Sequence, residues 1–417
     1  MTRATLDPPP IGELDAALRG CTRRLAAELV LATNAPPLWS DLEWRVAMAV
    51  AAMHGIAALL AARLRWQGPP RWQRFLAEQH RQGTLREQRV VQTLARINDM
   101  ARLRGLPLLA LKGSALLALR LHRVGERPMG DIDLLARASD LPAAAELLLA
   151  AGWTSEVATA RHHVFVPVSP PPTLRLGEHV DNPLRIELHA QIAERLPLAE
   201  VDITHTLWSR EALPGLNPYA STAALLRHLL LHAAGSMQNR SLRLVQLRDL
   251  ALLAPRLSAS DWDELLDDGS GGAAPWWAWP PLALARDCQG LVLPAAVQGR
   301  LEVACPPRLR RALRRLGLEG VSWTQISIEA FPGLEWARSP GEAAHYIFRR
   351  IVPPRSTLAL RRHPAVTPAS LAPQAWSSQS QWHRMARWLV STPPRVGTLR
   401  VVLLALDYEA ARGGDVA

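Results

Sequence analysis

The chain has 417 residues, 48% of them hydrophobic and 20% charged, which is the composition of a globular protein with two or three packed units. The formal net charge is +11, but the only lysine is Lys112 and the other 47 basic residues are arginine. This skew, together with abundant Ala, Leu and Pro, is typical of a compositional bias, so the charge is weak support for a nucleic-acid partner. Three cysteines without CxxC spacing argue against a disulfide framework or a structural zinc site and favour a cytoplasmic protein.

Residues 11–104 have helical periodicity, and we expect a helical N-terminal region over residues 1–90. Its most apolar stretch, residues 46–62, is short for a bilayer span and follows no signal-peptide pattern, which favours a buried helix and no membrane partner.

Short apolar runs then predict strands, and longer apolar segments between them predict helices. The strands are expected at 106–111, 131–136, 163–168 and 184–189, and the helices at 114–122 and 141–151. This alternation indicates an α/β (α+β) core with a mixed sheet over residues 91–215. A helical extension over 216–268, a glycine-rich linker over 267–275 and a C-terminal helical region over 276–417 complete the predicted domains.

Two carboxylates, Asp131 and Asp133, lie two residues apart in a strand-like run. The period of two places both on one face of the strand, while Ile132 and Leu134 face the other way. Adjacent negative charges repel, and a fold accepts that cost most readily where cations bind between them. The pair therefore predicts a site for Mg²⁺, with Mn²⁺ as the other candidate; the alternative is a solvated turn at the start of a strand.

A later run, 184–189, places Glu187 and His189 on one face of another strand. If the two strands are neighbours, three acids converge, and Glu187 is the third metal ligand or the general base. His189 is expected either to line this site or to pack near the core.

Upstream, Lys112, Gly113 and Ser114 lie where a strand gives way to a helix. Glycine permits close approach of a ligand, serine can cap the helix, and the helix N-terminus offers free amides to a phosphate. Lys112 adds a point charge, so these residues predict nucleotide binding. Arg127 is expected either to contact phosphate or to pair with a nearby acid.

Further along the chain, His228 and His232 have a spacing that could ligate a metal, but no third soft ligand accompanies them and helix packing is favoured. Asp249 is expected to be a helix-terminal charge or a buried partner for one of these histidines.

Taken together, these residues resemble the nucleotidyltransferase superfamily that includes DNA polymerase β and the aminoglycoside and lincosamide nucleotidyltransferases. The order Lys-Gly, Arg-x-x-x-Asp-x-Asp and acid-x-His is similar to a largely uncharacterised bacterial nucleotidyltransferase family, as are the histidine turn at 226–232 and the Arg-Asp-Leu at 248–250. The resemblance covers about residues 90–255, and the 16 residues between Ser114 and Asp131 are a longer spacing than in many members.

The resemblance implies Mg²⁺-dependent transfer of a nucleoside monophosphate from a nucleoside triphosphate such as ATP to a hydroxyl acceptor, with release of pyrophosphate. It assigns Lys112, Gly113, Ser114 and Arg127 to nucleotide binding, and Asp131, Asp133 and Glu187 to catalysis and metal binding. The acceptor, a small molecule, peptide or protein, is open. The alternative is a catalytically silent binding module for a protein or RNA partner, for which the five arginines of 308–315 are the candidate surface.

Overall fold

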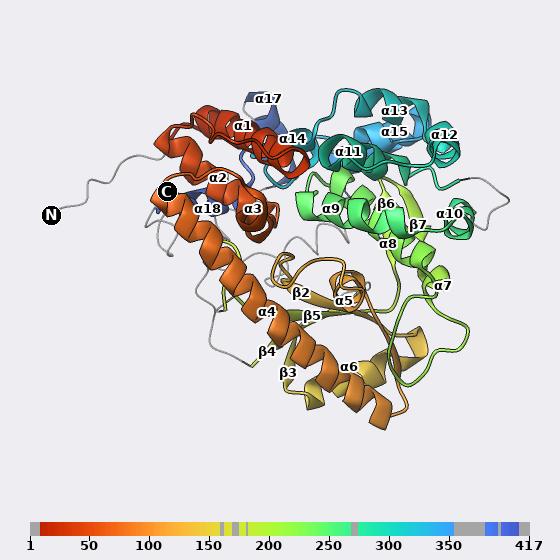
Figure 1. Ribbon diagram of the computed structural model, residues 1–417. Helices are drawn as coiled ribbons and strands as arrows, with labels where there is room; N and C mark the ends of the chain where they lie inside the picture. The colour runs from red at the N-terminus through yellow and green to blue at the C-terminus, as the bar shows by residue number, and fades with distance from the viewer. Residues whose placement is uncertain are drawn as a thin grey trace.

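The computed structural model describes residues 9–158, 162–168, 175–180, 182–267, 274–353, 380–390 and 393–407. In Figure 1 a mixed sheet with its helices forms the lower part of the molecule and a group of helices forms the upper part, with α4 running from one to the other. The N-terminal helices are α1 (Ile11–Val30), α2 (Asp41–Met53), α3 (Ala57–Arg63) and α4 (Pro70–Leu103).

The central segment contains the strands β1 (Pro107–Ala110), β2 (Asp131–Leu135), β3 (Trp153–Ala158), β4 (His162–Pro167), β5 (Arg185–His189), β6 (Ala193–Leu196), β7 (Ala199–Asp202) and β8 (Gly215–Asn217). Its helices are α5 (Lys112–Ala118), α6 (Leu141–Ala150) and α7 (Thr204–Leu207). Helices α8 (Thr222–Gln238), α9 (Leu244–Leu253) and α10 (Ala259–Leu266) follow. The rest of the described chain forms α11 (Trp279–Gln289), α12 (Ala295–Ala304), α13 (Pro307–Leu313), α14 (Leu318–Val321), α15 (Pro340–Ile351), α17 (Gln381–Val390) and α18 (Val396–Ala405).

Six strands form one mixed sheet in the order β3-β4-β5-β2-β1-β8. The pairs β2–β5 and β1–β8 are parallel, and the remaining neighbours are antiparallel. Ile132 and Leu134 of β2 and Ile186 and Leu188 of β5 are fully buried in a core that α4 and α6 also line. Because strand side chains alternate between faces, the acidic residues between them lie on the opposite face of the sheet.

The predicted strands correspond to β1, β2, β4 and β5, whereas β3, β6, β7 and β8 lie in segments where no strand was predicted. Helix α6 matches the predicted helix at 141–151, with Gly152 in the left-handed region after its end. Helix α5 begins at Lys112 and ends at Ala118, so the expected start at Ser114 and end at residue 122 are wrong. Most of the predicted linker, residues 268–273, lies outside the described residues.

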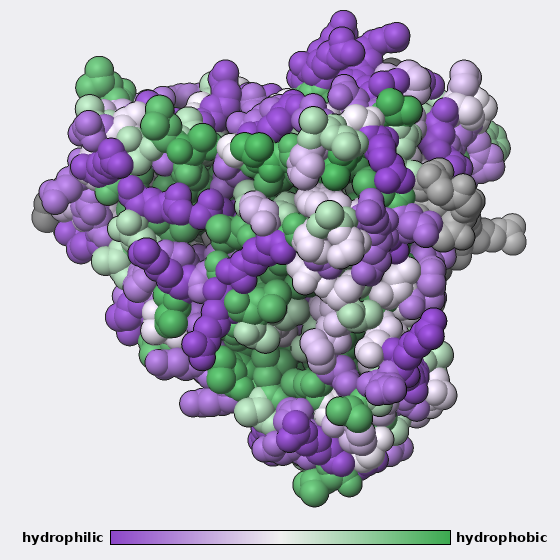
Figure 2. All heavy atoms as spheres, turned by 45° about the vertical axis from the view of Figure 1, so that its right-hand side comes forward, coloured by the Kyte–Doolittle hydropathy of each residue, from purple (hydrophilic) through white to green (hydrophobic). Residues whose placement is uncertain are grey.

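Helices from both ends of the chain share a second, larger core with α8 and α9. Ser40 starts α2 with a capping box to Glu43, and Gly55, with φ of +67°, allows the turn between α2 and α3. Among the described residues, no single helix is long and apolar enough to cross a membrane; α2 and α3 meet that criterion only together, and a 111° bend separates them. On the face in Figure 2, hydrophobic residues form a band between hydrophilic margins.

Candidate functional site

The candidate site lies where β2 and β5 run parallel, on the face of the sheet opposite the core that α4 and α6 line. Their register pairs Asp131 with Arg185, Asp133 with Glu187 and Leu135 with His189. The strands are therefore neighbours, and Asp131, Asp133 and Glu187 share one face of the sheet. Asp133 is buried, with 4% of its surface exposed, whereas Asp131 is exposed at the start of β2.

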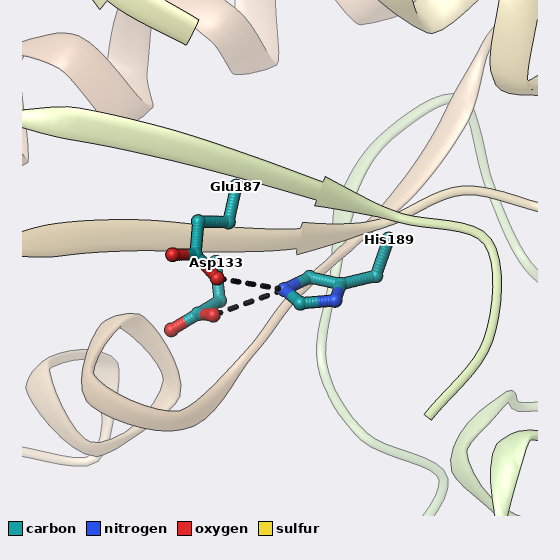
Figure 3. A group of neighbouring side chains, drawn as sticks. All are labelled: Asp133, Glu187 and His189. Atoms are coloured by element: carbon teal, nitrogen blue, oxygen red, sulfur yellow. Dashed lines mark hydrogen bonds and ion pairs between the residues drawn. The ribbon is translucent and has the colours of Figure 1, made fainter. Parts of the chain in front are cut away.

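A compact group of possible metal ligands forms around Asp133. One ligand atom each from Asp133, Glu187 and His189 lies within 4.8 Å of the other two. His189 Nε2 donates to Asp133 Oδ1 at 3.1 Å and lies 3.6 Å from Glu187 Oε2, as Figure 3 shows. The His162 ring lies beside the His189 ring at a centroid distance of 5.4 Å, tilted by 40°. Of the predicted ligands, Asp133 and Glu187 belong to this group, together with His189. Asp131 lies two residues before Asp133 on β2 and is not part of it.

Negative charge is crowded at this site, and it shifts the pKa values of the acidic side chains. Displacement of water by the surrounding protein, and then the charge of Asp133, raise the pKa of Asp131. Burial, and then the charges of Asp133 and Asp131, raise the pKa of Glu187. Burial also disfavours ionisation of Asp133, but Lys112 and His189 outweigh it and hold its pKa well below the usual range. A divalent cation would relieve the same repulsion.

Lys112, the only lysine, supplies the positive charge nearest the acids. Its Nζ donates to Asp133 Oδ1 at 2.8 Å. Its backbone has φ of +43°, in the left-handed region that costs energy for a residue with a side chain. The Lys112 amide donates to the Tyr219 hydroxyl at 3.1 Å, and that hydroxyl lies 2.7 Å from Nδ1 of His228. The hydroxyl therefore donates to His228, and α8 anchors the strained residue.

Gly113 and Ser114 occupy different environments. A Cβ on Gly113 would lie 2.6 Å from Arg127 Nη1, so only glycine leaves room for the guanidinium there. Ser114 is 3% exposed, does not cap α5, and its hydroxyl has no hydrogen-bond partner among the described residues. The helix-capping role expected for Ser114 is therefore wrong, whereas its assignment to nucleotide binding stays a prediction.

Arg127 is held in place by Asp249 of α9. Its Nε and Nη2 donate to the two carboxylate oxygens at 3.0 and 2.9 Å, and His122 Nε2 donates to Asp249 Oδ1 at 2.7 Å. Burial disfavours the charge of Asp249, but Arg127 and His122 outweigh it and lower its pKa. Asp249 is thus a buried partner, though of Arg127 and His122 and not of His228 or His232. Its separation of 122 residues from Arg127 hid this pair from sequence reasoning.

Two cavities adjoin the acids. One of about 130 Å³ is lined by Lys112, Gly113, Arg127, Asp131 and Asp133, and also by Arg243, which the sequence did not single out. The other, of about 210 Å³, is lined by Glu187, His189, His228, His232 and neighbouring residues. Burial, and then Lys112, lower the pKa of His232 to about 3, so this histidine is neutral at pH 7. The sequence favoured a packing role for His228 and His232, and the structure also places both in a cavity wall.

The donor set fits a hard divalent cation. Carboxylate oxygens are the ligands that Mg²⁺ prefers, and imidazole is an accepted ligand of Mn²⁺ and softer metals. The crowding of Asp131, Asp133 and Glu187 on one face of the sheet supplies the negative charge that such an ion neutralises. The residues present therefore fit a divalent metal ion.

Comparison with known proteins places this site in a family. Residues 40–272 match the model of the family described as uncharacterised nucleotidyltransferases. The match covers more than half of the chain, and the chain belongs to this family. It includes α2 to α10 and all residues of the site described above. No curated protein and no solved structure matches the chain.

Proposed function

We propose that this protein is a metal-dependent nucleotidyltransferase that transfers a nucleoside monophosphate from a nucleoside triphosphate to a hydroxyl acceptor. The acceptor oxygen forms a bond to the α-phosphorus, and the bond from that phosphorus to the bridging oxygen of the β-phosphate breaks. Pyrophosphate leaves with the electron pair, and the hydroxyl proton passes to a carboxylate of the site. The observation that carries the proposal is the register of β2 and β5, which aligns Asp133 with Glu187 beside Lys112.

The cavity of about 130 Å³ is the place we assign to the triphosphate. It combines Lys112, Arg127 and Arg243 with Gly113, whose missing side chain leaves the backbone accessible. Arg127 is oriented by Asp249, so its remaining nitrogen, Nη1, is directed over Gly113 without further ordering.

Asp131, Asp133 and Glu187 would hold the metal, with His189 positioned on Asp133. A bound Mg²⁺ or Mn²⁺ would neutralise phosphate charge and polarise the reacting oxygens. Lys112, which balances Asp133 in this structure, would then be able to pair with phosphate oxygens.

The test is nucleotide turnover with Mg²⁺ by Asp131→Asn and Asp133→Asn, measured as pyrophosphate release from each of the four nucleoside triphosphates. We expect a loss of at least 100-fold in both variants, and loss of Mn²⁺ binding measured by electron paramagnetic resonance. Asp263→Asn is the control, because Asp263 lies in α10, outside the site, and its side chain is 80% exposed. Full turnover by both site variants would refute the proposal.

A further inference from the structure

The cavity of about 210 Å³ adjoins the cavity that we assign to the triphosphate, because Lys112 and His232 line both. Asp133 lines the triphosphate cavity and Glu187 lines the other. These two carboxylates are direct partners in the register of β2 and β5. The acidic group therefore forms part of the wall of each cavity, and a molecule in the cavity of about 210 Å³ lies next to the carboxylates proposed to hold the metal.

Nucleotidyl transfer needs separate places for the acceptor and for the leaving pyrophosphate. The attacking and leaving oxygens lie roughly in line in phosphoryl transfer, so the acceptor approaches from the side away from the pyrophosphate. The cavity of about 210 Å³ is a separate space that also reaches the acids, which makes it the available place for the acceptor. Its volume is below the usual range for drug-sized ligands, about 300–1,000 Å³, and limits the acceptor to a small molecule.

The walls of the two cavities differ in charge. Arginine supplies all but one of the basic residues of this chain, and two arginines line the triphosphate cavity. No arginine is among the described residues that line the cavity of about 210 Å³, where the one lysine, Lys112, is already bonded to Asp133. Two carboxylates, Glu187 and Glu194, belong to the same wall. Electrostatic repulsion therefore disfavours an anionic acceptor in this cavity.

Glu194 of β6 lies against α8 at a position where α8 has a glycine. A Cβ at Gly235 would lie 2.8 Å from the carboxyl carbon of Glu194, so a larger residue there would displace the carboxylate. Gly235 lies inside α8, and glycine inside a helix costs about 1 kcal/mol relative to alanine. The Glu194 carboxylate is therefore accommodated at this cavity even though the glycine weakens the helix.

The polar groups of this wall suit hydroxyl groups. Ionised Glu187 and Glu194 can only accept hydrogen bonds. Burial lowers the pKa of His228, so its ring is neutral; because the Tyr219 hydroxyl donates to its Nδ1, the ring proton is on Nε2, which is then a donor. His232, also neutral, offers one donor and one acceptor. Hydroxyls both donate and accept, so an uncharged compound with several hydroxyls matches this combination of groups.

We propose that the cavity of about 210 Å³ binds the acceptor, a small uncharged polyol, and that Glu194 accepts hydrogen bonds from its hydroxyls. This proposal rests on the nucleotidyl transfer proposed above. One hydroxyl oxygen of the polyol forms a bond to the α-phosphorus, and its proton passes to Glu187, the carboxylate in the wall of this cavity. The bond from that phosphorus to the bridging oxygen of the β-phosphate breaks, and pyrophosphate leaves with the electron pair.

The test compares three polyols with their phosphorylated counterparts: glycerol with glycerol 3-phosphate, ribose with ribose 5-phosphate, and glucose with glucose 6-phosphate. A short RNA with a free 3′ hydroxyl is included as a larger anionic acceptor. Each is measured for acceleration of pyrophosphate release from nucleoside triphosphate with Mg²⁺ and for its effect on the unfolding temperature. Because polyols stabilise folded proteins in general, the shift that reports binding is the difference between the wild type and the cavity variants.

Two variants change this cavity and leave the acids and Lys112 in place. Glu194→Gln keeps the shape of the side chain and removes its charge, and Gly235→Ala displaces the same carboxylate through the added Cβ. Glu200→Gln is the matched control, because Glu200 lies on β7 of the same two-stranded sheet and its side chain is 48% exposed. Glu200 is not among the described residues that line the cavity.

We expect at least one of the three polyols to accelerate pyrophosphate release at least tenfold, and its phosphorylated counterpart to do so less than twofold. The KM for that polyol should rise at least fivefold in Glu194→Gln and in Gly235→Ala, and its temperature shift should shrink. The KM for nucleotide should change less than twofold, and Glu200→Gln should behave as wild type.

Unchanged polyol KM in both cavity variants would overturn the proposal. So would stronger acceleration by a phosphorylated compound or by the RNA than by any polyol, or no acceleration by any polyol in a wild type that consumes nucleotide. Failure of the proposed function gives a different result: the polyols still stabilise the wild type more than the two cavity variants, but no nucleotide is consumed. Absence of both the turnover and that difference in stabilisation overturns both proposals.

Discussion

Replacing Asp131 and Asp133 by asparagine should abolish turnover in both variants but change the free energy of unfolding differently. Asp133 is buried and accepts from Lys112 at 2.8 Å and from His189 at 3.1 Å. Its removal leaves Lys112, whose side chain is only 17% exposed, without its nearest counter-charge. Asp131 is exposed and adds to the repulsion, so its removal relieves the site.

The magnitude follows from the burial of the pair. Breaking a fully buried ion pair from one side costs about 3–5 kcal/mol. Because the Lys112 side chain keeps some exposure and Asp131 and Glu187 remain nearby, we expect Asp133→Asn to lose about 2–3 kcal/mol. Asp131→Asn should stay within about 0.5 kcal/mol of the wild type.

The pH dependence of this difference has a fixed sign. The folded pKa of Asp133 lies below its usual value, so its stabilisation is present above about pH 4, the ordinary pKa of aspartate, and is lost as the pH falls toward the folded pKa. The difference in unfolding free energy between the wild type and Asp133→Asn should therefore shrink below pH 4.

The assay is urea unfolding at pH 7.5 of the wild type, both asparagine variants, Lys112→Met and the double variant Lys112→Met/Asp133→Asn. We expect the double variant to be more stable than the sum of the single losses predicts, because each single change leaves one charge unpaired. Equal losses in the two asparagine variants, or additive losses in the cycle, would refute the electrostatic account of this site.

Two further predictions concern a buried histidine and a close contact. Burial, and then the charge of Arg243, lower the pKa of His54 to about 3. Between pH 6.5 and 3, therefore, only the unfolded chain binds a proton at this histidine. The free energy of unfolding should fall by about 1.4 kcal/mol for each unit by which the pH is lowered in this range. His54→Asn keeps an acceptor for the Leu244 amide and should lose this share of acid sensitivity in urea unfolding at pH 6.5 and 5.5; an unchanged slope would contradict the reasoning. Gly113→Ala should raise the KM for nucleotide at least tenfold, because the added Cβ would displace Arg127. Gly12→Ala is the control, because there is open space around Gly12. Equal KM values for nucleotide in Gly113→Ala and the wild type would contradict the close contact between Gly113 and Arg127.

The sequence was sufficient to predict a strand or helix where the pattern of residues within that one element specifies it. Alternation of Asp131 and Asp133 with Ile132 and Leu134 predicted both the strand and its two faces, and the structure has that strand with its apolar face buried. The short strand β8, three residues long, gave no such signal. It is a strand because β1 offers it a free edge, and that edge exists only in the folded sheet.

Ion pairs between residues distant in the chain could not be predicted from the sequence, for a similar reason. Arg127 was expected to contact phosphate or a nearby acid, and the carboxylate that it binds, on α9, follows it by 122 residues.

The sequence by itself determined the chemistry available to this protein: two carboxylates at strand spacing, a third acid before a histidine, and one lysine in a chain that otherwise uses arginine. These are local properties, set by the two-residue repeat of a strand and by the identity of the side chains. The tertiary structure decided which charges meet, because the parallel register of β2 and β5 and the docking of α8 and α9 bring together residues that chain distance keeps independent. Electrostatic energy depends on separation in space, and only folding fixes that separation.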